Sequence, residues 1–256
     1  MTESVNSLAG CARLLRSGEF RLQDYLDAIE EFFQKREPVV KAFLPEEGRF
    51  ARLHRDAREL RERYSDTGER PALFGIPVGV KDIFNVDGFE TRAGSQLPPD
   101  EFAGPEAECV TRLKNAGALI LGKTVTAQFA FLAPGVTRNP HQPEHTPGGS
   151  SSGSAAAVGA GMCALTLGTQ TVGSINRPAA FCGVVGLKPS YERVSRSGVL
   201  PVSASLDHVG FFTSDTESAQ LAASVMIPGW EFSNPKRRPV LAVPEGPYLE
   251  KVSDEG

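Results

Sequence analysis

The sequence predicts an α/β fold in which helices flank a mixed, largely parallel central sheet. Two observations lead to this class. Short apolar runs that suit buried strands alternate along the chain with helical patterns, and this order is typical of parallel sheets. The chain has 256 residues, of which 40% are hydrophobic, so it is long and apolar enough to fill a substantial core.

We expect two parts, a helical segment over residues 1–65 and an α/β core over residues 66–256. In the first part, two sets of apolar residues repeat at steps of four, three and four residues, as expected of amphipathic helices that bury one face. The sets are Leu22, Leu26, Ile29 and Phe33, and then Leu53, Ala57, Leu60 and Tyr64. We interpret both helices as scaffold.

In the core, strands and helices are predicted in alternation. Apolar runs predict buried strands at 75–84 and 163–170, and a last strand at 238–246. The predicted helices are 154–162, 176–183 and 216–226, and residues 109–132 are expected to form a helix, a glycine stop, an apolar strand and another helix. The residues after 246 are polar and do not complete the sheet, so we expect later sequence to supply a C-terminal part of the core.

The composition favours small, soluble partners. The formal net charge is -4 and no run of lysine and arginine is long, so we expect no direct nucleic-acid contact and no membrane binding. The four cysteines are widely separated and lack the paired spacing of a zinc or dithiol site. With no apolar signal segment at the N-terminus, we expect a cytoplasmic protein with reduced thiols and no bound metal.

A first candidate site is GALILGKT, residues 117–124, which matches the pattern of a phosphate-binding loop. Such a loop follows a strand and presents its backbone amides to phosphate. Here the intervening residues are Ala-Leu-Ile-Leu, which favour a buried strand, so we reject the match. Lys123 is then expected to be a surface lysine at the end of that strand.

A second candidate is GSSSG, residues 149–153, which satisfies the nucleophile-elbow pattern around Ser151, with Asp207 and His208 downstream as partners. An elbow stands between a strand and a helix, whereas the preceding residues contain two prolines that a central strand does not accept. Asp207 and His208 are also adjacent, which is a poor arrangement for a carboxylate that orients a base. We expect His208 to be a loop residue.

The third candidate combines Lys81, the serine run that begins at Ser150, and Ser174. A lysine can act as a base when burial lowers its pKa, because desolvation disfavours the ammonium form. Lys81 ends an apolar run, where such burial is plausible. From the residues alone, an ordinary structural lysine beside Asp82 is the favoured alternative.

Three segments resemble the amidase signature family in their order and spacing. They are GIPVGVKDIF (75–84), PGGSSSGSAAAVGAG (147–161) and GTQTVGSINRPAAFCGVVGLKPS (168–190). The resemblance runs from about Phe74 to Thr213, and a helical N-terminus is also typical of the family. It implies the amidase-signature fold, no cofactor, and a whole protein longer than 256 residues whose later part closes the substrate pocket.

The resemblance also implies a Ser-Ser-Lys triad, with Ser174 as nucleophile, Ser150 as bridging serine and Lys81 as base. The proton of Ser174 would then pass through Ser150 to the neutral lysine, and no histidine is required. In this family the bridging serine follows a cis peptide bond, which falls here between Gly149 and Ser150. The implied reaction is hydrolysis of an amide through an acyl-enzyme on Ser174.

An oxyanion hole is implied at the loop before the nucleophile. The backbone N–H groups expected to form it belong to Thr171, Val172, Gly173 and Ser174. The family usually has glycine in place of Val172. A side chain there would narrow the pocket, or strain the turn if the backbone needs a positive φ. Gln170 stands where many members have aspartate.

Arg177 and Ser151 are the expected substrate-binding residues. Arg177 lies three residues beyond Ser174 and could form a bidentate pair with a substrate carboxylate. Some family members that act on small carboxylated amides resemble this chain in having arginine at that place. An arginine that braces loops is the alternative.

Two further functions stay open at this point. A glutamine-hydrolysing amidotransferase subunit, which passes ammonia to an acceptor on a partner, would use the same acyl chemistry. A catalytically impaired relative would keep the fold for binding. The corresponding assemblies are a homodimer or a complex with amidotransferase partner subunits.

Overall fold

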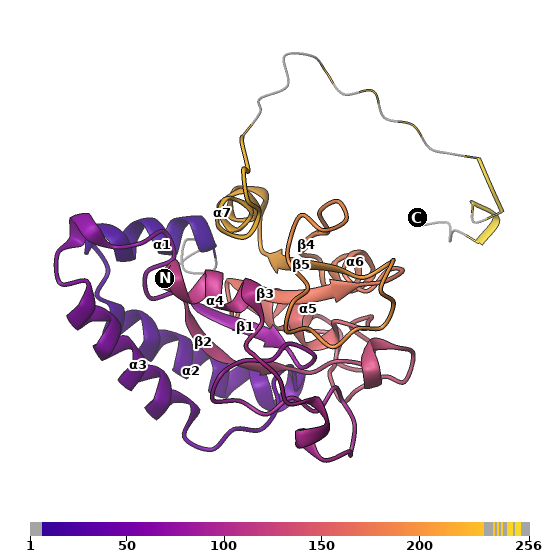
Figure 1. The fold of residues 1–256 in the computed structure, drawn as a ribbon, viewed down its shortest axis with the longest axis horizontal. Coiled ribbons are helices and arrows are strands. Elements are labelled where there is room, and N and C mark those ends of the chain that lie inside the picture. Colours follow the sequence, from indigo (N-terminus) through magenta and orange to yellow (C-terminus); the bar gives the residue numbers. More distant parts are fainter. Residues whose placement is uncertain are drawn as a thin grey trace.

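The computed structural model describes residues 7–232 and, beyond them, residues 238, 240, 242, 245–247 and 249–251. The chain begins with three helices, shown in indigo and purple in Figure 1: α1 (Leu8–Ser17), α2 (Leu22–Val40) and α3 (Arg49–Arg63). Ser7 caps α1 with its side chain, and Gly18 ends α1 in the left-handed conformation, which glycine adopts at no steric cost.

Over the described residues, the sheet has five strands in the order β2-β1-β3-β5-β4. Their bounds are β1 (Pro77–Lys81), β2 (Leu119–Thr124), β3 (Leu165–Gln170), β4 (Val185–Leu187) and β5 (His208–Thr213). β1 pairs in parallel with β2 and β3, whereas β5 runs antiparallel to both of its neighbours. Since only β5 is reversed, the expected mixed, largely parallel sheet is confirmed.

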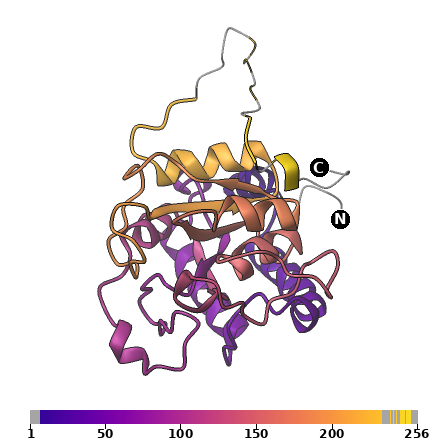
Figure 2. The same cartoon turned by 90° about the vertical axis from the view of Figure 1, so that its right-hand side faces the viewer.

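In the described part of the chain, four more helices follow the N-terminal three. They are α4 (Glu108–Asn115), α5 (Ser152–Gly159), α6 (Asn176–Cys182) and α7 (Thr216–Met226). Figures 1 and 2 show α7 on one face of the sheet and α5 on the other. Short 3-10 turns occur at Thr67–Glu69, Pro99–Phe102, Gln128–Ala130 and Leu249–Lys251.

One apolar core extends from the N-terminal helices α1, α2 and α3 to α7, the helix that follows β5. The predicted stripe of α2 is buried, from Leu22 to Phe33, and it joins one cluster that also contains Phe211 of β5 and Met226 of α7. The helices before residue 65 therefore share their apolar core with the sheet that follows. Among the described residues, no helix combines the length and the hydropathy needed to cross a membrane.

The helix predicted after β2 is wrong, because the chain makes only the 3-10 turn Gln128–Ala130, in which Phe129 has a φ of 50° that no helix accepts. The short strands β4 and β5 were not predicted. The last predicted strand, 238–246, falls largely outside the described residues.

Candidate active site

Lys81 is the last residue of β1, and its side chain is fully buried. β1 is an interior strand of the sheet, with β2 and β3 on either side, and all five of its residues are buried. The ammonium nitrogen Nζ donates to Ser150 Oγ at 2.9 Å and to Thr169 Oγ1 at 2.9 Å. No carboxylate contacts Lys81 directly among the ion pairs of the described residues.

Burial lowers the pKa of Lys81 to about 7, and the negative charge of Asp207 opposes this shift. The cause is desolvation, because an ammonium ion without water or a contacting carboxylate is costly to hold. Near neutral pH, a large fraction of Lys81 is therefore unprotonated. A neutral amine hydrogen-bonded to a serine hydroxyl is a group that can accept the proton of that hydroxyl.

Ser150 stands just before α5, where the chain enters the helix from a long irregular segment. The peptide bond between Gly149 and Ser150 is cis. The Ser150 carbonyl accepts a hydrogen bond from the Ala127 N–H at 3.0 Å. Gly153, in the first turn of α5, lies close against another segment, since a Cβ there would be 2.2 Å from the Ala42 carbonyl oxygen. The backbone around Ser150 is thus held by neighbouring segments.

Ser151 is completely buried and links the start of α5 to β3. Its hydroxyl donates to the Thr169 carbonyl at 3.1 Å and accepts from the Thr169 N–H at 3.3 Å. Gly168 provides the space, because a Cβ there would lie 2.9 Å from Ser151 Oγ. These two bonds bring the segment that carries Ser150 against the strand that carries Thr169.

Ser174 follows β3 in a loop that leads into α6, and only 7% of the residue is exposed. Gln170, the last residue of β3, holds this loop: its Oε1 accepts from the N–H groups of Ile175 at 2.8 Å and Asn176 at 2.9 Å. The hydrogen bonds of the described residues join Lys81 to Ser150 but do not join Ser150 to Ser174.

The predicted oxyanion loop lies between Gln170 and Ser174. The Thr171 hydroxyl donates to Asp207 Oδ1 at 2.5 Å. Val172 is 85% exposed and has no positive φ, so its side chain points to solvent and the backbone there is unstrained. Gly173 is also open, with no atom closer than 3.9 Å to an added Cβ. The strain considered for Val172 is therefore absent.

Arg177 is exposed and lies at one edge of the site. Its Nε donates to the Gly149 carbonyl at 2.9 Å, so the guanidinium braces the loop before Ser150. Arg177 also lines a cavity of about 240 Å³ together with Phe131, Leu132 and Phe181. The arginine thus combines a bracing contact with a position on a partly apolar cavity.

Two expectations about neighbouring residues are wrong. Lys123 is not a surface lysine, since it is 4% exposed and forms an ion pair with Asp82 at 2.9 Å. Asp82, the partner of Lys123, directly follows Lys81 in the sequence, and the sequence pattern did not predict this ion pair. His208 is not a loop residue but begins β5, where its backbone pairs with Gln170.

Sequence reasoning missed the supporting roles of Thr169, Gln170 and Asp207. In the sequence, Asp207 is a candidate only as a partner of His208, whereas in the structure it contacts Thr171. The position of Thr169 and Gln170 at the end of an apolar run was the available signal, because residues at the carboxyl ends of strands often line sites in α/β proteins.

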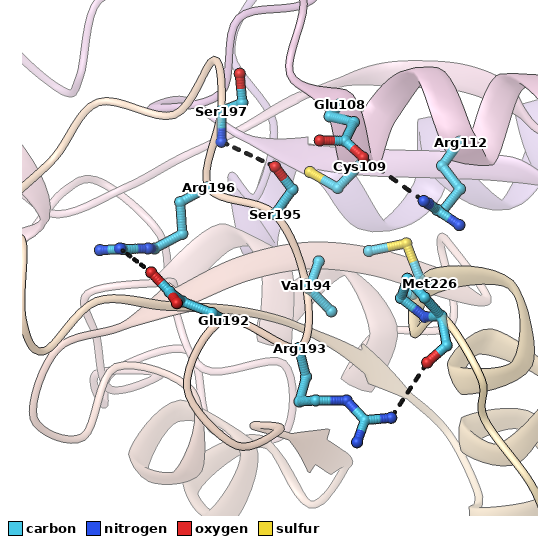
Figure 3. Close-up of a pocket in the computed structure, with 11 residues that line it drawn as sticks. Glu108, Cys109, Arg112, Glu192, Arg193, Val194, Ser195, Arg196, Ser197 and Met226 are labelled. Carbon is cyan, nitrogen blue, oxygen red and sulfur yellow. Dashed lines mark hydrogen bonds and ion pairs between the residues drawn. The ribbon is translucent and has the colours of Figure 1, made fainter.

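A separate cavity of about 430 Å³ lies away from these residues and is shown in Figure 3. Its wall combines apolar residues such as Val194 and Met226 with charged ones, and Arg196 pairs there with Glu192 and Arg112 with Glu108. Neither Lys81 nor Ser150 nor Ser174 lines it. Among the described residues, no group of three or more His, Cys, Asp or Glu side chains could hold a metal ion.

The site as a whole joins a buried lysine to a serine that follows a cis peptide bond, next to a loop with a second serine. A neutral lysine amine bonded to a serine hydroxyl is an arrangement that suits enzymes in which a lysine, rather than a histidine, serves as the base. The chain belongs to the Amidase family, whose sequence profile matches residues 22–254. The resemblance found in the sequence is thereby confirmed.

Individual relatives agree with this assignment. The chain is 42% identical over 207 residues to a glutamyl-tRNA(Gln) amidotransferase subunit from Syntrophobacter fumaroxidans (strain DSM 10017 / MPOB), a match that covers 78% of this chain and 38% of the relative. Among solved structures, one described as an amidase has a TM-score of 0.76 and 38% identity, and the match covers 86% of this chain and 51% of that protein.

A peptide amidase from Stenotrophomonas maltophilia is a further structural neighbour, with a TM-score of 0.78 and 32% identity over 91% of this chain and 51% of the neighbour. The chain therefore spans about two fifths of the length of the relative from Syntrophobacter fumaroxidans and about half of each structural neighbour.

Proposed function

We propose that this protein is an amidohydrolase that cleaves a small amide through an acyl-enzyme on Ser174, with Ser150 and Lys81 completing a Ser-Ser-Lys triad. The observation that carries the proposal is the hydrogen bond of 2.9 Å between Lys81 Nζ and Ser150 Oγ, in a fully buried setting that lowers the pKa of Lys81 to about 7. Family membership and the amidase neighbours support the same reaction class.

The proposed reaction begins when Ser174 Oγ attacks the carbonyl carbon of the amide. The serine proton passes to Ser150 Oγ while the Ser150 proton passes to the neutral Lys81 Nζ. The carbonyl oxygen becomes an oxyanion, which the N–H groups of residues 171–174 hold. Collapse of this intermediate breaks the C–N bond, and the leaving nitrogen takes the proton back from Lys81 by way of Ser150. Water then releases the acyl group by the same proton path.

A fluorophosphonate probe tests the proposed nucleophile, because it reacts with activated serines. We expect a single adduct on Ser174 by mass spectrometry of the intact protein and of its peptides. Ser174→Ala should abolish the adduct and Ser150→Ala should slow its formation by at least about a hundredfold. Ser224→Ala on α7, whose hydroxyl donates to the Leu221 carbonyl, is the matched control. A folded wild type that forms no adduct would instead favour the binding-only relative.

The substrate is proposed to be a small amide that carries a carboxylate, with Arg177 as the substrate-binding residue. Ser151, which was also expected to bind substrate, is fully buried with its hydroxyl bonded to the backbone of Thr169, so we assign it to support of the site. Arg177 lines the cavity beside Gly149, and its Nε alone is used by the Gly149 carbonyl, so the remaining face of the guanidinium could take a carboxylate. Arg177→Leu should lower kcat/KM for carboxylated amides at least about tenfold more than for neutral amides of equal size. Equal losses on both substrates would refute the carboxylate preference.

An amidotransferase role is the second candidate, since the relative from Syntrophobacter fumaroxidans is a subunit of a glutamyl-tRNA(Gln) amidotransferase. In that case glutamine would be the amide, and ammonia would pass to an acceptor on partner subunits. Glutaminase activity that appears only with co-purifying proteins would favour this role over a free-standing homodimeric amidase. A cytoplasmic location also stays a prediction.

A further inference from the structure

Asp207 lies beside the proposed oxyanion loop and is 8% exposed. Its carboxylate accepts three hydrogen bonds. One comes from the Thr171 hydroxyl at 2.5 Å, and the others come from the N–H groups of Val202 at 2.7 Å and Ser203 at 2.9 Å. The carboxylate thus joins two segments that are distant in sequence, the loop after β3 and the turn before β5.

The turn at Val202 forms one wall of a cavity of about 290 Å³, and Thr169 and Asp207 lie on the same cavity. Thr169 is the residue whose hydroxyl accepts from Lys81. Asp207 therefore holds the turn on one side and the start of the oxyanion loop on the other, next to the hydroxyl that contacts the lysine. A carboxylate with charge-assisted bonds on both oxygens fixes both segments more firmly than a neutral group would.

We propose that Asp207 is a positioning residue of the active site, which holds Thr171 and the turn at Val202 and Ser203 in the arrangement that the reaction at Ser174 requires. This inference rests on the proposed function for its catalytic consequence. The structural part, that one carboxylate holds both segments in place, can be tested without any activity.

The charge of Asp207 has a second effect, on the lysine. Asp82, which follows Lys81 in the sequence, is paired with Lys123. Arg196 and His208, which line the same cavity as Asp207, are bonded to the Ala204 and Leu206 carbonyls. Asp207 is the charge that raises the pKa of Lys81 against the effect of burial. Removing this charge should therefore lower the pKa of Lys81 further, since a nearby negative charge favours the ammonium form.

The experiment compares Asp207→Asn, Thr171→Val and Asp215→Asn in the full chain. Asp215 is the matched control, because it is also an aspartate that accepts from a backbone N–H and a hydroxyl, both of Ser218, at the start of α7. Two quantities are measured for each variant: the rate of fluorophosphonate labelling of Ser174 from pH 5 to 9, and the hydrogen exchange of the amides of Val202 and Ser203.

Asp207→Asn should slow labelling at its pH plateau by at least about tenfold, and it should move the half-maximal pH of labelling below that of the wild type. It should also speed exchange of the Val202 and Ser203 amides by at least about tenfold. Thr171→Val should slow labelling but leave the half-maximal pH unchanged, because the Asp207 charge remains. Asp215→Asn should change neither labelling nor these two amides.

Unchanged exchange at Val202 and Ser203 in Asp207→Asn would overturn the positioning role, whatever the labelling does. Faster exchange with unchanged labelling would also overturn it, since the two segments would then be irrelevant to Ser174. If the wild type does not label at all, the proposed function fails, and the exchange measurement still decides whether Asp207 holds the turn.

Discussion

Two buried lysines stand at the ends of neighbouring parallel strands and have different surroundings. Lys123 of β2 pairs across the sheet with Val80, one residue before Lys81 of β1. Lys123 contacts the Asp82 carboxylate at 2.9 Å, and its Nζ also donates to Thr91 Oγ1 and the Glu90 carbonyl. Among the described residues, Lys81 Nζ has two hydrogen-bond partners, and both are hydroxyls. Burial lowers the pKa of both lysines. For Lys123, the contacting Asp82 carboxylate raises the pKa against this effect, whereas Lys81 has no contacting carboxylate among the described residues.

This difference shows how one sheet can hold one lysine in an ion pair and leave another free for the proposed chemistry. A buried ammonium ion with a carboxylate and two further acceptors remains a satisfied ion pair. A buried amine with only hydroxyl partners gives up its proton near neutral pH. The contacting partner, rather than burial itself, separates the two roles.

The largest expected effect is on the reactivity of Ser174. Lys81→Met should slow fluorophosphonate labelling by at least about a thousandfold, because the proposed base is lost while the side-chain volume is kept. The double variant Asp82→Asn with Lys123→Met should label within about tenfold of the wild type, since that pair supports the fold and takes no part in the proposed proton path. Labelling rates from mass spectrometry measure both. If the two proteins lost labelling rate equally, the proposed difference in role between Lys81 and Lys123 would be wrong.

The second effect is on stability, because the two lysine substitutions should change the free energy of unfolding in opposite directions. Lys123→Met alone leaves the buried Asp82 carboxylate unpaired, so the free energy of unfolding should fall by about 3 to 5 kcal/mol. Lys81→Met removes a buried ammonium group that no carboxylate contacts. It should raise the free energy of unfolding at pH 6 by a few kcal/mol, about the free energy that corresponds to the lowered pKa. Denaturant unfolding monitored by circular dichroism measures both values.

The stability gained in Lys81→Met should depend on pH, because the pKa of Lys81 is about 7 in the folded protein and its ordinary value is 10.5. Between these values the unfolded chain binds a proton that the folded protein does not. The wild type should therefore become more stable as pH rises from about 7 towards 10.5. The advantage of Lys81→Met should be greatest below pH 7 and should shrink over the same range. A gain that does not depend on pH would mean that the folded lysine keeps its ordinary pKa.

The smallest effect concerns the second hydroxyl partner of Lys81. Thr169→Val removes the acceptor at 2.9 Å and keeps the shape of the side chain. Labelling of Ser174 should slow by roughly fivefold, which corresponds to about 1 kcal/mol for one hydrogen bond. Thr169→Ser, which retains the hydroxyl, should restore most of the rate. Full activity in Thr169→Val would show that Ser150 alone orients the lysine.

Much of the fold could be predicted from local patterns. The stripes of α2 and α3, the apolar run that ends at Lys81 and the strand before Gln170 each depend on residues close together in the sequence. The short strand β4, with three half-buried residues, has no such pattern, and it was missed. The helix expected after β2 failed at Phe129, where the packing of the loop selects a left-handed backbone that no residue propensity predicted.

The sequence by itself determined the fold class, the family and the candidates Lys81, Ser150 and Ser174, because apolar periodicity and motif spacing are local properties of the chain. Only the tertiary structure decided which buried lysine has a carboxylate partner, that Val172 points to solvent, and that Asp207 joins Thr171 to the turn at Val202. The physical reason is that burial and hydrogen bonding depend on which segments meet in space. The lowered pKa of Lys81 and the hydrogen bonds that support the proposed oxyanion loop both depend on these contacts between distant segments.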